Sequence, residues 1–159
     1  MHRYLTGLFF YCLFSIQSLF AERLPFLVGT SQAVVSPATG AYIAGHTLNR
    51  KFTGWHDDLY AKAIVISDGS ESIALITVDC IGLLYPQLQQ VRERVAATLS
   101  EKELPAAHVL LSSTHTHAGP DVVGLWGPER MISGVDTTYL STLVQTCAEQ
   151  VIKAFRNRK

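Results

Sequence analysis

Two histidines, His115 and His117, stand one residue apart in the stretch SSTHTHAGPD, where an apolar run gives way to glycine and proline. In an extended backbone, residues two apart point to the same side, so we expect the two imidazoles to address one point in space. Neutral imidazole is a preferred zinc ligand, and a catalytic zinc takes about three protein ligands plus a water. The alternative is a pair of loop histidines bonded to backbone carbonyls, and these two residues alone leave both interpretations open.

The strands that would position this loop are indicated by residue type and turn chemistry. The segments LYAKAIVIS at 59–67 and SIALITVD at 72–79 are rich in β-branched residues and flank the turn sequence Asp68-Gly69-Ser70-Glu71. This pattern predicts an antiparallel hairpin. A short apolar run at 108–112, just before the two histidines, predicts a third strand.

Two amphipathic helices are predicted around that third strand. The first begins near Pro86, with apolar residues recurring every three or four positions at Leu88, Val91, Val95 and Leu99. The second is capped by Asp136 and carries an apolar stripe from Leu140 to Phe155. The order of elements predicts a layered α/β fold, with a mixed β-sheet, flanking helices and a long loop at 113–135.

Composition limits the class of protein. The 159 residues are 48% hydrophobic, which predicts one globular domain. The 13 basic residues balance 13 acidic ones and form no basic stripe, which argues against a nucleic-acid partner. Cys80 lies in a strand-like run and Cys147 on a helix-like face, so we expect two buried free thiols.

Residues 1–21 have the layout of a secretory signal peptide. Arg3 precedes an apolar stretch from Leu5 to Phe20, and the small residue Ala21 follows this stretch. The apolar stretch is shorter than the roughly 20 residues that a membrane span needs. However, a cleavage site after Ala21 would need a small residue at position 19, which is Leu19. An uncleaved N-terminal anchor therefore remains the alternative. We expect an exported protein, secreted or located in the cell envelope or periplasm.

From about Leu27 onward, the chain resembles the N-terminal domain of the neutral/alkaline, non-lysosomal ceramidases. The matching stretches, in order, are VGTSQAVVSP, IAGH, GWHDDLYAKAIVISD, ITVDCIGL and LLSSTHTHAGP. The last of these is the most specific, because the family has a strand ending in THTHSGP, with serine where this chain has Ala118. The resemblance implies that residues 22–159 form the N-terminal part of a ceramidase-like catalytic domain.

The resemblance also implies roles for individual residues. His115 matches a zinc ligand of the family, and His117 matches a catalytic histidine that lies beside the substrate amide. Gly45 matches a glycine that lines the substrate pocket. The family has a tyrosine after this glycine, and this chain has His46 there. His56 and Asp79 match family positions to which we assign no role. A hydrogen-bonded loop histidine and a turn or cap carboxylate are the simpler interpretations of those two residues.

The implied activity is zinc-dependent hydrolysis of the N-acyl amide of a ceramide-like lipid, with peripheral contact to a membrane surface. Zinc can polarise an amide carbonyl and lower the pKa of a bound water toward about 7, while His117 serves the oxyanion or the leaving amine. The family's other ligands, a histidine, a glutamate and a tyrosine, fall outside the matched region, so this chain alone is expected to be an inactive fragment. The alternatives are a hydrolase of another amide or ester, and a non-catalytic lipid- or carbohydrate-binding module on the same fold.

Overall fold

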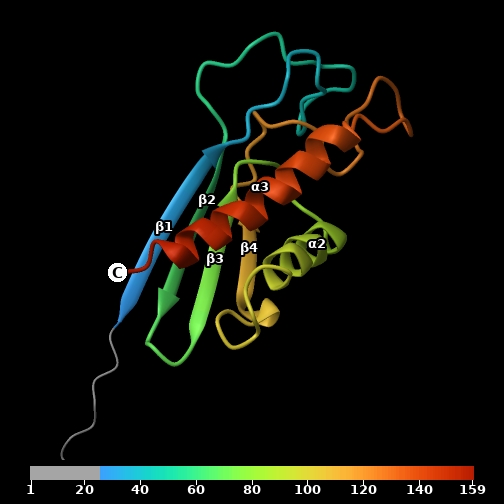
Figure 1. Ribbon diagram of the computed structural model, residues 1–159. Helices are drawn as coiled ribbons and strands as arrows, with labels where there is room; N and C mark the ends of the chain where they lie inside the picture. Colours follow the sequence, from blue (N-terminus) through green and yellow to red (C-terminus); the bar gives the residue numbers. More distant parts are fainter. Residues whose placement is uncertain (1–25) are drawn as a thin grey trace, which may run out of the picture.

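The computed structural model of the protein describes residues 26–159, so the predicted signal peptide lies outside the described residues. The elements are β1 (Leu27–Val34), β2 (Tyr60–Ser67), β3 (Ser72–Val78), α2 (Tyr85–Ala96), the short 3-10 helix η1 (Ala106–His108), β4 (Val109–Ser113) and α3 (Thr137–Arg156). The strands form one sheet in the order β1-β2-β3-β4 (Figure 1). The first two pairings are antiparallel and the third is parallel, so the predicted mixed α/β fold is confirmed.

The predicted hairpin is confirmed as β2 and β3. Its register pairs Ala61 with Val78 at one end and Ser67 with Ser72 at the turn. In the turn, the Asp68 carboxylate accepts the backbone N–H groups of Glu71 and Ser70, both at 2.8 Å. These two bonds favour the ionised form and hold the pKa of Asp68 below its usual value.

Helix α3 begins where the sequence predicts. Oδ1 of Asp136 accepts the N–H groups of Thr138 and Tyr139 at 2.9 and 3.0 Å, which satisfies two donors that the first helical turn leaves free. The helix crosses β1, β2 and β3, and Gly29 of β1 lets the strand backbone approach the helix at Ala154. Its apolar stripe therefore covers the sheet.

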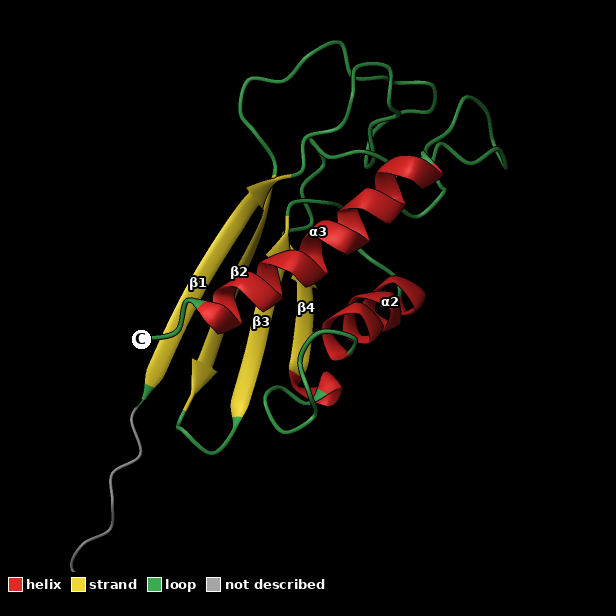
Figure 2. Ribbon diagram, viewed as in Figure 1, coloured by secondary structure: helices red, strands yellow, loops and turns green. Residues whose placement is uncertain are grey.

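Helix α2 packs beside α3, and both helices lie on the same side of the sheet (Figure 2). Pro86 stands in its first turn, where a missing N–H costs nothing. The helix ends at Ala96, before Leu99, which is buried in the turn that follows. The predicted stripe thus continues beyond the helix itself.

The core lies between the two helices and the sheet face that they cover. Alternate residues of β2 and β3 point into it and are buried, and so are both thiols, which are free as predicted. Burial raises the pKa of Cys147 to about 12 and also raises that of Cys80. The opposite sheet face is more open, with Ile73, Leu75 and Leu110 exposed.

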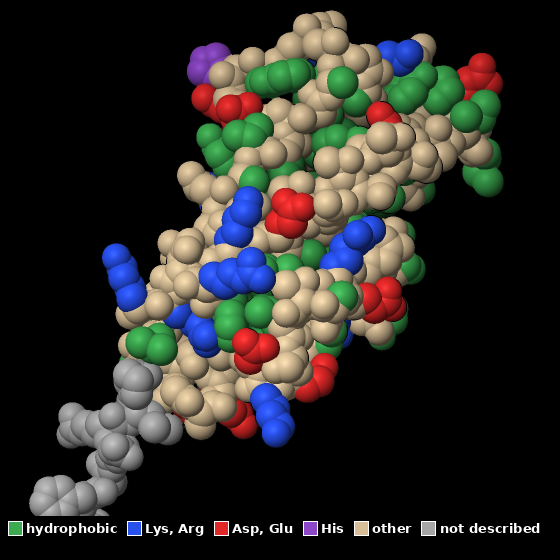
Figure 3. All heavy atoms as spheres, in the orientation of Figure 1, with side chains coloured by type: hydrophobic (Ala, Val, Ile, Leu, Met, Phe, Trp, Pro, Cys, Tyr) green, Lys and Arg blue, Asp and Glu red, His purple; other side chains and the backbone are tan. Residues whose placement is uncertain are grey.

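Charged side chains of both signs lie on the face of the molecule shown in Figure 3. On the face shown in Figure 3, Lys and Arg side chains are scattered among Asp and Glu and form no continuous basic area. This distribution agrees with the zero formal net charge of the sequence.

Candidate active site

The loop that carries the two histidines leaves the sheet at the end of β4. The Thr114 N–H still bonds to the Val78 carbonyl at 3.0 Å, and the next residue, His115, turns sharply with φ of 60°. Such a left-handed conformation is unfavourable for a residue with a Cβ. The expectation of an extended backbone through His115 was therefore wrong.

The two imidazoles nevertheless lie side by side. Their ring centroids are 5.4 Å apart and their planes meet at 71°. His115 and His117 are both exposed, so their rings are open to an external ligand. The turn at His115 thus brings together two side chains that sequence spacing alone assigned to one side of a strand.

Each ring is oriented by a backbone carbonyl. Nδ1 of His115 lies 2.7 Å from the Ile81 carbonyl oxygen, and Nδ1 of His117 lies 3.1 Å from that of Gly45. Because a carbonyl oxygen can only accept, Nδ1 carries the proton in both neutral rings, and Nε2 keeps its lone pair. These carbonyl bonds are what the loop-histidine interpretation expects, and they are also the arrangement that orients metal-binding histidines.

Gly45 forms the support for the His117 ring. Its φ is +79°, and a Cβ at this position would stand 2.9 Å from the Cβ of His117 and closer still to the ring. The segment that contains it is joined to the histidine loop by a bridge between Ile43 and Pro120 and by an N–H bond from Ala44 to the Gly119 carbonyl at 3.0 Å. Gly45 therefore sets where His117 lies.

Asp121 organises the loop on the other side of the histidines, and sequence reasoning missed it. Its side chain is 2% exposed, and its carboxylate accepts five backbone N–H groups at 2.7 to 3.3 Å, from residues 123, 124, 125, 126 and 134. Its own N–H bonds to the Tyr42 carbonyl at 2.8 Å. The available signal was a lone carboxylate in the apolar, glycine-rich stretch PDVVGLWG.

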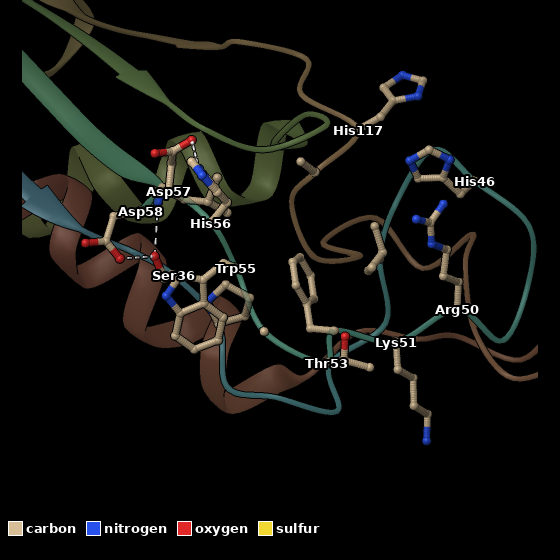
Figure 4. Close-up of a pocket in the computed structure, with 16 residues that line it drawn as sticks. Ser36, His46, Arg50, Lys51, Thr53, Trp55, His56, Asp57, Asp58 and His117 are labelled. Carbon is tan, nitrogen blue, oxygen red and sulfur yellow. Dashed lines mark hydrogen bonds and ion pairs between the residues drawn. The ribbon is translucent and has the colours of Figure 1, made fainter.

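A cavity of about 570 Å³ opens beside His117. His117 and His46 stand on one side of it, with ring centroids 6.1 Å apart, while Asp57, Asp58 and Ser36 stand on the other (Figure 4). The residues that line it include neither His115 nor Gly45. The predicted substrate-pocket glycine thus lies behind His117, outside the cavity wall.

His56 and Asp79, to which no role was assigned from the sequence, make simple hydrogen bonds, and the two tryptophans near the site differ in burial. Asp79 accepts the Tyr60 N–H at 2.9 Å at the end of the hairpin, and His56 pairs with Asp57 at 2.9 Å on the surface. Both contacts fit the simpler interpretations given above. Trp126 packs against the core, whereas Trp55 is 46% exposed and lines the cavity.

A complete zinc site is not present within residues 26–159. The orientation of His115 suits a ligand, but no group of three or more His, Cys, Asp or Glu side chains in this part of the chain could hold a metal ion. Two imidazoles fall short of the three protein ligands of a catalytic zinc. Over the same residues, no helix is long and apolar enough to cross a bilayer.

Comparison with known proteins places the fold. The chain resembles the crystal structure of neutral ceramidase from Pseudomonas aeruginosa, with a TM-score of 0.67 and 20% identity over 86% of this chain. A ceramidase complexed with C2 is similar, with a TM-score of 0.68 and 22% identity over 86% of this chain. The chain spans 22% of the length of each of these proteins. No protein-family model matches it. The resemblance at this identity is one of fold, and it agrees with a partial ceramidase-type domain.

Proposed function

We propose that this chain supplies part of the active site of a zinc-dependent amidohydrolase that cleaves the N-acyl amide of a ceramide-like lipid to a fatty acid and a sphingoid amine. The observation that carries the proposal is the pair of exposed imidazoles, each with Nδ1 on a backbone carbonyl and with no partner for Nε2 among residues 26–159. The ceramidase-like fold supports it. In this proposal His115 is one zinc ligand, and the others come from outside residues 26–159.

His117 has a separate role in the proposal. Its ring lies at the cavity, 5.4 Å from that of His115, so a substrate amide held near His115 would also be near His117. A neutral imidazole with a free Nε2 first accepts a proton and can then donate it to the departing amine nitrogen. The bond from Nδ1 to the Gly45 carbonyl fixes the ring for this transfer.

The test compares hydrolysis of a fluorogenic ceramide by three proteins: this chain, a polypeptide that continues through the missing ligands, and that polypeptide with His115→Ala. We expect the first and third to be inactive and the second to be active. A His117→Ala variant should keep its zinc and lose about 10²- to 10⁴-fold in kcat. Activity in the short chain would mean that its own residues complete the site.

An active His115→Ala variant would refute the ligand assignment. Lipid binding without hydrolysis in the longer protein would favour the non-catalytic module instead. For the chain by itself, calorimetry should detect only weak zinc binding, since one or two imidazoles retain little of the affinity of a complete site.

A further inference from the structure

The cavity beside His117 has walls of opposite charge. Figure 4 shows Arg50 below His46, on the same side as His117, and Asp57 and Asp58 on the far side. An uncharged lipid amide would make little use of such a division.

Arg50 is the cation available to a ligand on its wall. Among residues 26–159, its guanidinium takes part in no hydrogen bond or ion pair with another side chain. The neighbouring Lys51 also lines the cavity, but its Nζ lies 4.7 Å from the centre of the Tyr42 ring, and in Figure 4 its side chain runs away from Arg50 and His46. A guanidinium stays protonated at all relevant pH values, so the charge on this wall is permanent.

The acidic wall already has partners. Asp58 accepts the Ser36 hydroxyl at 2.8 Å, and Asp57 pairs with His56 at 2.9 Å. Both carboxylates are exposed. They would repel an anionic group and favour its binding on the wall that carries Arg50.

Between the two walls, the cavity has apolar side chains. Phe52 is 7% exposed, Ile43 and Leu59 are half-buried, and Trp55 presents a large exposed aromatic surface. These groups suit an acyl chain, which gains about 25 cal/mol for each Å² of apolar surface removed from water.

From these features we infer that the site takes lipid amides that carry a carboxylate close to the amide, that is, N-acylated amino acids. The carboxylate would bind the Arg50 guanidinium, whose fork of N–H donors matches its two oxygens. The acyl chain would lie along Trp55 and Phe52, with the amide beside His117. This inference rests on the proposed function, since it names the substrate class of the same site.

A matched pair of ligands tests it on the chain as it stands. N-dodecanoylglycine and N-dodecanoylethanolamine share the acyl chain and the amide and differ in carrying a carboxylate or a hydroxymethyl group. Titration calorimetry below the micellar concentration, with tryptophan fluorescence as a second readout, should show tighter binding of the glycine derivative. Because Arg50 is exposed, we expect a preference of about two- to fivefold, which shrinks as salt is added.

Two variants separate Arg50 from general surface charge. Arg50→Gln should abolish the preference, while Lys51→Gln, which removes an equal charge from the neighbouring residue, should preserve it. Equal binding of the two ligands, absence of binding, or a preference that survives Arg50→Gln would overturn the inference. The hydrolysis test of the proposed function depends on His115 and not on Arg50, so the two can fail separately.

Discussion

Replacing Gly45 with alanine tests whether this glycine positions the candidate catalytic histidine. At φ +79°, a residue with a Cβ pays about 1 to 2 kcal/mol of backbone strain. The new Cβ would also stand 2.9 Å from the Cβ of His117 and closer to its ring. Ordinary carbon–carbon contacts are about 3.5 to 4.0 Å, so the ring must retreat by about 1 Å.

That retreat breaks the bond between Nδ1 of His117 and the Gly45 carbonyl, now 3.1 Å long. A hydrogen bond of this kind contributes about 0.5 to 1.5 kcal/mol. Together with the strain, the expected loss in free energy of unfolding is about 1.5 to 3.5 kcal/mol, or a fall in Tm of about 3 to 14 °C. The imidazole ¹⁵N signals of His117 should change, and those of His115, which is held by Ile81, should not.

Gly40 provides the matched control. Its φ is +90°, but nothing lies within 4 Å of the position that a Cβ would occupy. Gly40→Ala therefore carries the strain without the collision, and it should cost about 1 to 2 kcal/mol and leave the His117 signals unchanged. If thermal melts of the two variants coincide and His117 does not respond to Gly45→Ala, the positioning role of Gly45 is wrong.

Two further substitutions test the backbone around the same site. Asp121→Asn keeps the shape of the side chain but replaces the acceptor Oδ2 by an amide donor or weakens both acceptors. We therefore expect denaturant unfolding to show that the free energy of unfolding falls by about 3 kcal/mol or more. A fall below about 1 kcal/mol would contradict the role of the carboxylate. At His115, with φ of 60°, the glycine variant should be more stable than the alanine variant by about 1 kcal/mol, whereas His117 should show the reverse order. Alanine more stable than glycine at both positions would show that His115 is not strained.

Elements fixed by local signals could be predicted from sequence. The hairpin follows from β-branched residues on either side of an Asp-Gly turn, and α3 follows from the Asp136 cap and one apolar stripe. In each case the residues that decide the structure lie within a few positions of one another. Strand β1 differs, because its pairing partner β2 is about 30 residues away in sequence and no local turn joins the two strands.

The geometry of the candidate site depended on long-range contacts and could not be predicted in this way. His117 is oriented by a carbonyl 72 positions away in sequence, and His115 by one 34 positions away. The residue types around His115 did not predict its left-handed conformation, because histidine is not a residue that such a turn requires. Residue type and spacing therefore predicted which side chains converge, but not how.

The position of the strain bears on the proposed function. A left-handed non-glycine residue costs about 1 kcal/mol or more, and it persists where the surrounding structure fixes it. At His115 the surroundings do so through the Ile81 carbonyl, and the loop that follows is fixed in turn by the five bonds to Asp121. Glycine at position 115 would relieve this strain, but it would also remove the side-chain donor to the Ile81 carbonyl. The chain instead keeps an imidazole there, with Nε2 directed away from its own hydrogen bond, which is what a ligand approaching from outside requires.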